Sequence, residues 1–163
     1  MVKVKICGLT NQADYNLACQ LGADYAGFVF YRKSLRFIEP ELARKLVRQA
    51  KYQAIKVGVF VNEQASIIRE IYDYVGLDIV QLQGDEEPDF CRQLGLPYWK
   101  AIRAKDTSDV EKLKKFPGDI FLLDSFSGVA YGGTGKQLAR SLLREALKIW
   151  KKIVLAGALS ALN

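Results

Sequence analysis

The stretch VKVKICGLTNQADYNLACQLGADYAGFVF, residues 2–30, decides the fold class because it contains a complete strand–helix–strand unit. Val2–Ile6 is a β-rich run that predicts a strand, and Tyr25–Phe30 predicts a second one. Between them, Asn11–Leu21 carries apolar residues at helical spacing. Two strands that flank a helix in this way are typical of a βαβ unit, in which the strands run parallel.

The alternation of strands and helices continues along the whole chain, and no long linker or low-complexity tract interrupts it. The predicted strands are 2–6, 25–30, 54–61, 78–82, 98–103, 119–123 and 153–156. The predicted helices are 11–21, 40–50, 67–75, 86–94, 107–115 and 138–150. The apolar face predicted for the first helix consists of Ala13, Leu17 and Leu21.

This order of elements predicts a barrel. Parallel strands joined by right-handed crossovers form either an open doubly wound sheet or a closed barrel. The chain has about seven predicted strands and no glycine-rich nucleotide-binding motif after the first strand, which favours the barrel. We therefore predict an α/β fold of the (β/α)8 TIM barrel type, in a single domain over residues 1–163. Catalytic groups of such barrels follow the strands. The candidates at these positions are Cys7, residues 31–36, Asn62, Gln83, Arg103, Asp124 and Gly157.

The composition argues against several classes of protein. Half of the residues are apolar and 26% are charged, which is ordinary for a globular protein. The chain has no apolar run of the roughly 18 residues that a membrane span needs, and its first residues lack a secretory signal. Its three cysteines show no C-x-x-C spacing. We therefore expect no metal site, no cofactor, no disulfide framework and a cytoplasmic location.

The net charge of +6 comes from basic residues that are dispersed along the chain. We interpret their small clusters as solvated helix faces and expect no nucleic-acid partner, because no basic stripe with interleaved aromatic residues occurs. A positive excess would also suit a small anionic substrate. Because the chain has no histidine, any acid–base chemistry must come from Cys, Asp, Glu, Lys or Tyr.

The glycine-rich stretch VAYGGTGKQ, residues 129–137, fails both common nucleotide-binding patterns. The phosphate-binding loop G-x-x-x-x-G-K-[ST] would need a glycine at Ala130 and a hydroxyl at Gln137. The dinucleotide pattern G-x-G-x-x-G also fails, because Gly133-Thr134-Gly135 leads on to Leu138. The stretch therefore needs another explanation.

Several motifs in one order provide that explanation. In them the sequence resembles phosphoribosylanthranilate isomerase, an enzyme family of tryptophan biosynthesis. The resemblance runs through the whole chain, and each motif falls on a predicted βα loop, which makes the match specific. The motifs are VKICGLT (4–10), GADYAGFVFYRKSLRFIEP (22–40), VGVFVNE (57–63), VQLQGDE (80–86) and LLDSFSGVAYGGTGK (122–136).

The resemblance implies an Amadori rearrangement of N-(5-phosphoribosyl)anthranilate to 1-(2-carboxyphenylamino)-1-deoxyribulose 5-phosphate. One group must give a proton to the ribose ring oxygen, and another must remove the proton from C2. By resemblance, Cys7 is the general base and Asp124 is the general acid. Taken without the resemblance, Cys7 would be a packing residue and Asp124 a helix cap or turn residue.

The resemblance also implies residues that bind the substrate. Arg36 matches the arginine that binds the anthranilate carboxylate; otherwise it is a surface loop charge. The stretch after the sixth strand resembles a lid, in which Gly132 and Gly133 would contact the ligand; otherwise it is an exposed loop. Gly157 belongs to a stretch that resembles the phosphate loop. Gln83 stands where family members commonly have histidine, so it can position a group but cannot transfer a proton.

The end of the chain departs from the family pattern. LAGALSALN, residues 155–163, has Ala158 and Ala161 in the glycine and proline places of the phosphate loop, and the last βα units have no counterpart. We therefore expect a barrel truncated at its C-terminal end, an incomplete phosphate site, low or absent activity, and association into a homo-oligomer through open sheet edges. The alternatives are a non-catalytic fragment that associates in this way, and another phosphate-binding barrel enzyme. The lysines available to such an enzyme are Lys5, Lys56 and Lys100.

Overall fold

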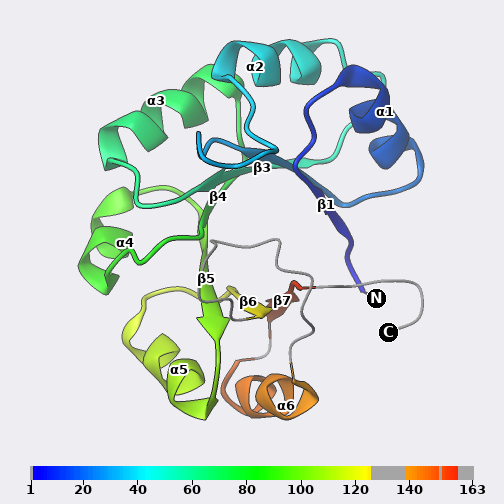
Figure 1. The fold of residues 1–163 in the computed structure, drawn as a ribbon. Helices are drawn as coiled ribbons and strands as arrows, with labels where there is room; N and C mark the ends of the chain where they lie inside the picture. The colour runs from blue at the N-terminus through cyan, green and yellow to red at the C-terminus, as the bar shows by residue number, and fades with distance from the viewer. Residues whose placement is uncertain (1, 126–138, 151, 158–163) are drawn as a thin grey trace. The chain divides into compact units, whose positions relative to one another are not determined.

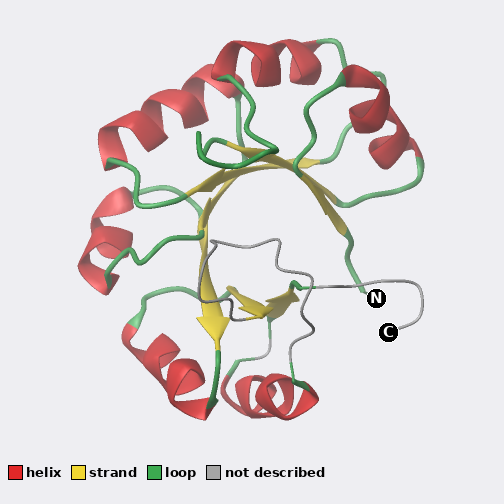
Figure 2. Cartoon of the chain, in the orientation of Figure 1, coloured by secondary structure: helices red, strands yellow, loops and turns green. Residues whose placement is uncertain are grey.

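The computed structural model of the chain describes residues 2–125, 139–150 and 152–157. The chain divides into two compact units, Met1–Gln81 and Leu82–Asn163. Strands alternate with helices in both units (Figures 1 and 2). The predicted alternation is thus confirmed, whereas a single domain over residues 1–163 stays a prediction.

In the first unit, parallel strands carry helices on one face. Its elements are β1 (Lys5–Cys7), α1 (Gln12–Gln20), β2 (Tyr25–Val29), α2 (Pro40–Arg48), β3 (Ile55–Phe60), α3 (Ala65–Val75) and β4 (Ile79–Leu82), whose last residue begins the second unit. β1 pairs with β2 and β2 with β3, so that Gly27 lies opposite both Cys7 and Val57. In Figure 1, α1, α2 and α3 cover the same face of these strands. The carboxyl ends of the strands therefore meet at one edge.

Local signals explain where the helices of the first unit begin and end. The Asn11 side chain caps α1 by accepting a hydrogen bond from the Asp14 amide at 2.9 Å. Pro40 opens α2, where its missing amide hydrogen costs nothing. Gly76 ends α3 with a left-handed φ of 75°, a conformation that glycine adopts without strain.

The predicted apolar face of α1 is wrong. Leu17 and Leu21 are 53% and 78% exposed. The buried residues of α1 are Tyr15, Ala18 and Cys19. The Tyr15 ring stacks on Phe28 of β2, with 5.8 Å between the ring centroids. Both sets have helical spacing, so the periodicity of the sequence could not decide between the two faces.

The second unit continues the same pattern. Its elements after Leu82 are α4 (Pro88–Leu94), β5 (Tyr98–Ala104), α5 (Thr107–Lys112), the 3-10 helix η1 (Leu113–Lys115), β6 (Phe121–Ser125), α6 (Arg140–Ile149) and β7 (Ile153–Leu155). β5 pairs in parallel with β6 and β6 with β7. α5 and α6 lie side by side (Figure 1). One core cluster of the unit contains Ala104, Val110, Leu113, Phe121, Leu123, Leu142 and Ala146.

Two strand boundaries differ from the prediction in ways that affect the site. The first strand begins at Lys5 rather than Val2, because the Val4 amide donates to Asp24 Oδ2 at 2.8 Å instead of joining the strand pairing. β6 runs to Ser125 rather than ending before Asp124, because Arg103 of β5 pairs opposite Asp124. Cys7 and Asp124 therefore lie within the last residues of their strands.

Candidate active site

Cys7 ends β1 and has a cationic neighbour from the same strand. Its side chain is half-buried. Lys5 lies two residues earlier, and side chains two residues apart on a strand share one face. Lys5 Nζ donates to Cys7 Sγ at 3.1 Å and to Gln81 Oε1 at 2.8 Å. Because Gln81 belongs to β4 and is buried, it fixes the ammonium group beside the sulfur.

Gly27 leaves room for this arrangement. It lies opposite Cys7 in the pairing of β1 with β2. A Cβ atom at residue 27 would lie 2.9 Å from Cys7 Sγ and 3.1 Å from Lys5 Cε. Side chains do not approach each other this closely, so any residue larger than glycine would displace the thiol or the ammonium group.

Arg36 lies over the residue that follows Cys7. Gly8 has a left-handed φ of 85°, and a Cβ atom there would lie 2.5 Å from Arg36 Cδ. Residue 8 must therefore be glycine for two reasons, its backbone conformation and the space that Arg36 occupies. Arg36 itself is exposed, and its backbone amide is held by Ser34 Oγ at 3.1 Å. The structure thus brings the predicted carboxylate-binding arginine next to the predicted base.

Asp124 lies in the second unit, at the carboxyl end of β6. It is 6% exposed, and Gln83 is 5% exposed. Gln83 Nε2 donates to Asp124 Oδ2 at 3.2 Å. Gln83 directly follows β4, so the amide reaches the carboxyl group from a different strand. The contact can orient a carboxyl group, but the amide has no proton to exchange in acid–base chemistry.

Gly157 and Arg103 also lie near the strand ends of the second unit. The Ala156 amide donates to the Leu123 carbonyl at 2.8 Å, so that Gly157 follows directly with a left-handed φ of 99°. Arg103 is half-buried, and its Nη2 bonds to Asp85 Oδ1 at 2.8 Å. Gly132 and Gly133 lie outside the described residues, as do Ala158 and Ala161.

Sequence reasoning missed how Lys5 and Gln81 act on Cys7. The signal for Lys5 was available, because a lysine two residues before Cys7 on a strand must share its face. Gln81 carried no such signal, since its contact with Lys5 spans 76 residues of sequence.

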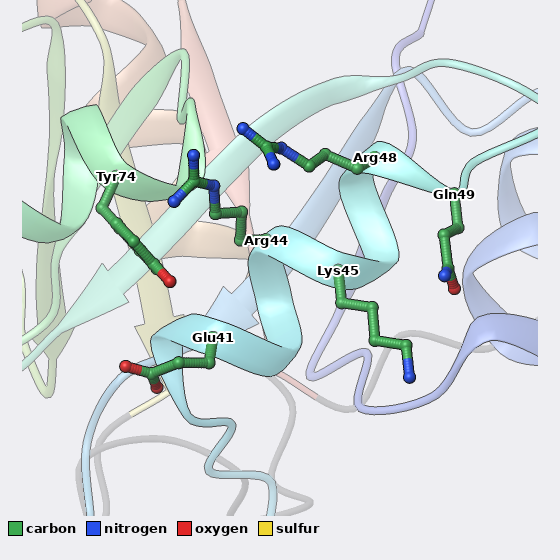
Figure 3. Close-up of a pocket in the computed structure, with 6 residues that line it drawn as sticks. All are labelled: Glu41, Arg44, Lys45, Arg48, Gln49 and Tyr74. Carbon is green, nitrogen blue, oxygen red and sulfur yellow. The ribbon is translucent and has the colours of Figure 1, made fainter.

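A separate surface pocket of about 280 Å³ lies on α2 and α3. Figure 3 shows Arg44 and Arg48 projecting from α2 on one side of the helix, with Tyr74 of α3 beside them. Arg44 Cζ lies 4.3 Å from the centroid of the Tyr74 ring. No predicted site residue lines this pocket, so it is not part of the candidate active site.

Within the described ranges, no cluster of Cys, Asp or Glu side chains could hold a metal ion. In the same ranges, no helix is both long and apolar enough to cross a membrane. The candidate reactive groups are therefore a thiol in the first unit and a buried carboxyl group in the second, each with its own hydrogen-bond donor.

Comparison with known proteins connects these two groups to one family. The model of the N-(5'-phosphoribosyl)anthranilate (PRA) isomerase family matches residues 4–163. The chain belongs to this family. The isomerase of Pelobacter propionicus is 43% identical over 163 residues, which cover 100% of this chain and 78% of that relative.

Solved structures of the isomerase family agree with the fold. Monomers generated from the dimeric isomerase of Thermotoga maritima superpose with a TM-score of 0.83 at 38% identity, covering 98% of this chain and 77% of that one. A family complex with reduced 1-(o-carboxyphenylamino)-1-deoxyribulose 5-phosphate gives a TM-score of 0.82 at 36% identity, covering 98% and 77%. The predicted (β/α)8 fold class is therefore confirmed.

Membership in the isomerase family also confirms the resemblance and the enzyme class predicted from the motifs. The alternative of a non-catalytic fragment is not favoured, because these relatives carry the name of the isomerase over the matched length. The roles of the individual residues stay predictions.

Proposed function

We propose that this chain converts N-(5-phosphoribosyl)anthranilate to 1-(2-carboxyphenylamino)-1-deoxyribulose 5-phosphate in tryptophan biosynthesis. The observation that carries the proposal is a thiol and a carboxyl group, Cys7 and Asp124, at the carboxyl ends of strands in a chain that matches the isomerase family over residues 4–163. Enzymes of this fold class place their catalytic groups at these strand ends. The family complex with a reduced form of the product supports the phosphorylated substrate.

The rearrangement needs one group that gives a proton and one that takes a proton. Asp124 gives its carboxyl proton to the ribose ring oxygen, the bond from that oxygen to C1 breaks, and the anthranilate nitrogen forms an iminium ion with C1. Cys7, as thiolate, takes the proton from C2, the electron pair of that C–H bond forms the C1–C2 double bond, and the π electrons of the iminium move to nitrogen, which gives an enolamine. Passage of the proton from the Cys7 thiol to the Asp124 carboxylate restores both groups before the next turnover. Transfer of a proton from the C2 hydroxyl to C1 then gives the ketone, so that substrate and product are isomers.

The neighbours of the two groups support these roles. Lys5 donates a charge-assisted hydrogen bond to Cys7 Sγ at 3.1 Å, which keeps the sulfur in one place. Gln83 donates to Asp124 Oδ2 at 3.2 Å and so orients the carboxyl group. A neutral amide is suited to this task because it leaves the proton on the acid.

Substrate binding is assigned to the residues predicted from the motifs. Arg36 binds the anthranilate carboxylate, since a guanidinium group can form two parallel hydrogen bonds with a carboxylate. Its position over Gly8 would bring that end of the substrate close to Cys7. Gly157 contributes to the phosphate site, and Gly132 and Gly133 to the lid.

The alternative enzyme class, a barrel enzyme with a strand lysine as its reactive group, is not supported by a specific observation. Each of the three strand lysines has hydrogen-bonding or ion-pair partners. These are Cys7 and Gln81 for Lys5, Asp78 for Lys56, and Glu86 for Lys100.

Association into a homo-oligomer is part of the proposal. Val2, Val4 and Ile6 are 89%, 50% and 41% exposed, and apolar residues that alternate in this way favour contact with another surface. The Thermotoga maritima relative is named as dimeric. Sedimentation velocity should show a dimer or a larger species, and Val4→Lys should shift it toward the monomer. A stable monomer of the unmodified chain would contradict this.

We place the enzyme in the cytoplasm. Cys7, Cys19 and Cys91 are all free thiols, which suits a reducing compartment. Recovery of the protein in the secreted fraction of a producing cell would contradict this location.

The proposed function is tested with freshly prepared phosphoribosylanthranilate, by following the loss of its fluorescence. Cys7→Ala and Asp124→Ala should each abolish turnover, because each removes a group that moves a proton. Cys19→Ala is the matched control for the thiol, since Cys19 is a buried cysteine of α1 to which no role in the reaction is assigned. Turnover that survives both changes would remove the assignment of base and acid.

A further inference from the structure

Lys100 and Glu86 form an ion pair in the interior of the second unit. The distance from Lys100 Nζ to Glu86 Oε2 is 2.8 Å, and the two side chains are 3% and 2% exposed. Removing each ion from water is unfavourable, and a buried pair is often no more stable than apolar residues of the same size. Stability alone is therefore a poor explanation for these charges.

Both partners bind the backbone of the segment that follows β4. Lys100 Nζ donates to the Gly84 carbonyl at 2.7 Å and reaches the Leu82 carbonyl at 3.5 Å. The other oxygen of the carboxylate, Glu86 Oε1, accepts a hydrogen bond from the Gly84 amide at 3.1 Å. The ion pair thus holds both polar groups of the Gly84 backbone.

The segment held in this way carries Gln83, which lies between Leu82 and Gly84. Gln83 Nε2 is the donor to Asp124 Oδ2. Lys100 comes from β5, which pairs with the strand of Asp124. The Lys100 side chain therefore binds the backbone on both sides of Gln83, the residue that contacts the proposed acid.

We propose that Lys100 and Glu86 are a positioning pair, which fixes the backbone around Gln83 so that its amide meets the Asp124 carboxyl group in one orientation. The inference rests on the proposed function, because it takes Asp124 as the acid. The pair moves no proton itself. Its effect on turnover passes through Gln83.

The first experiment replaces the charges with apolar residues of similar size: Lys100→Met, Glu86→Leu and the double variant. Lys100→Met should lower kcat by up to about tenfold, the loss expected when the Gln83 contact itself is removed, and leave KM within about twofold. The double variant should recover thermal stability relative to the single variants, because no buried charge is left unpaired, but it should not recover kcat. Lys112→Met is the control, because the Lys112 side chain is 61% exposed although it also forms an ion pair, with Asp109.

The second experiment separates positioning from a general loss of structure. In a Gln83→Ala background, Lys100→Met should lower kcat by no more than about twofold, because residues that act through one contact are not additive. An equal fold-loss of kcat in both backgrounds would overturn the proposal. Recovery of wild-type kcat by the double charge variant would also overturn it.

A third measurement does not depend on turnover, so it separates this inference from the proposed function. The side-chain amide signals of Gln83 in a 15N-edited NMR spectrum should shift in the double charge variant and stay in place in Lys112→Met. Unshifted Gln83 signals in the double variant would overturn the positioning role even if the unmodified chain has no turnover. Absence of turnover in the unmodified chain would count against the proposed function alone.

Discussion

The two halves of the proposed site are held in different ways. In the first unit, Cys7 is half-buried, and the donor to its sulfur comes from the same strand, two residues away. In the second unit, Asp124 is buried, and its donor Gln83 is 41 residues away in the sequence. The base therefore depends on strand alternation and on space at Gly27, whereas the acid depends on long-range contacts. Changes near each group should reveal this difference.

The largest effect is expected where a side chain would enter the space of the base. Gly27→Ala should lower kcat by up to about 100-fold, because its Cβ atom would lie 2.9 Å from Cys7 Sγ and displace it. It should also lower the free energy of unfolding by about 1–3 kcal/mol, the usual cost of overpacking. Steady-state turnover measures the change in kcat, and urea unfolding measures the change in the free energy of unfolding.

Gly58→Ala is the matched control on the neighbouring strand. Its Cβ atom would lie 2.4 Å from Leu77 Cδ1 and 2.9 Å from the Phe60 ring, and Cys7 is not among its three nearest contacts. It should destabilise the protein by a similar amount, about 1–3 kcal/mol, while kcat of the folded enzyme stays within a few-fold. Equal losses of kcat in the two variants would mean that Gly27 has no special relation to the thiol.

Removal of the hydrogen-bond donors to Cys7 and Asp124 tests whether the two groups are held in different ways. Lys5→Met and Gln83→Leu should each lower kcat by roughly tenfold, since each removes a hydrogen bond, which contributes about 1 kcal/mol between neutral groups and about 1.5–3 kcal/mol when one group is charged. Gln83→Leu should also cost about 1–3 kcal/mol of stability, because it takes a donor from the buried Asp124 carboxyl group, and Lys5→Met should cost less, because the hydrogen bonds of Lys5 to Cys7 and Gln81 are only partly buried. Lys56→Met, which breaks the ion pair with Asp78, is the control for loss of a strand lysine. Equal losses of stability in the two donor variants would show that the surroundings of Cys7 and of Asp124 are held in the same way.

A smaller effect on catalysis is expected from Arg36, which lies on an exposed loop of the first unit. Arg36→Ala should raise KM by roughly tenfold and change kcat little, because it removes a charge-assisted contact with the bound substrate. Its effect on unfolding should stay within about 0.5 kcal/mol, since the side chain is exposed. A loss of thermal stability in proportion to the loss of affinity would make Arg36 structural.

The last test leaves the sequence unchanged and measures which of the three thiols react in the folded protein. Cys7 should react with a disulfide reagent in the folded protein, and substrate should slow the reaction. Burial raises the pKa of the Cys91 thiol to about 11 and also raises the pKa of Cys19, so both should stay thiols and react only after unfolding. Rapid reaction of a second thiol in the folded protein would contradict the burial of these two residues.

Sequence reasoning proposed both catalytic candidates, but it did not identify the side chains that surround them. Cys7 and Asp124 follow apolar runs, and such runs are recognisable without knowledge of the fold. Lys5 and Lys100 were recognised as strand lysines, but the sequence favoured no partner for either. Lys5 reaches Gln81 across 76 residues, and Lys100 reaches Glu86 across 14. Such contacts depend on how strands pair, which no local pattern specifies.

By itself the sequence determined the alternation of strands and helices, the family and the strand ends at which Cys7 and Asp124 lie, because periodicity and motif order are local properties. Only the tertiary structure decided that Tyr15, rather than Leu17 and Leu21, packs α1 on the sheet. It likewise decided that Gly27 must leave space for the thiol, and that a buried ion pair holds the backbone around Gln83. These features arise when strand pairing and burial set the distances between side chains that are far apart in the sequence.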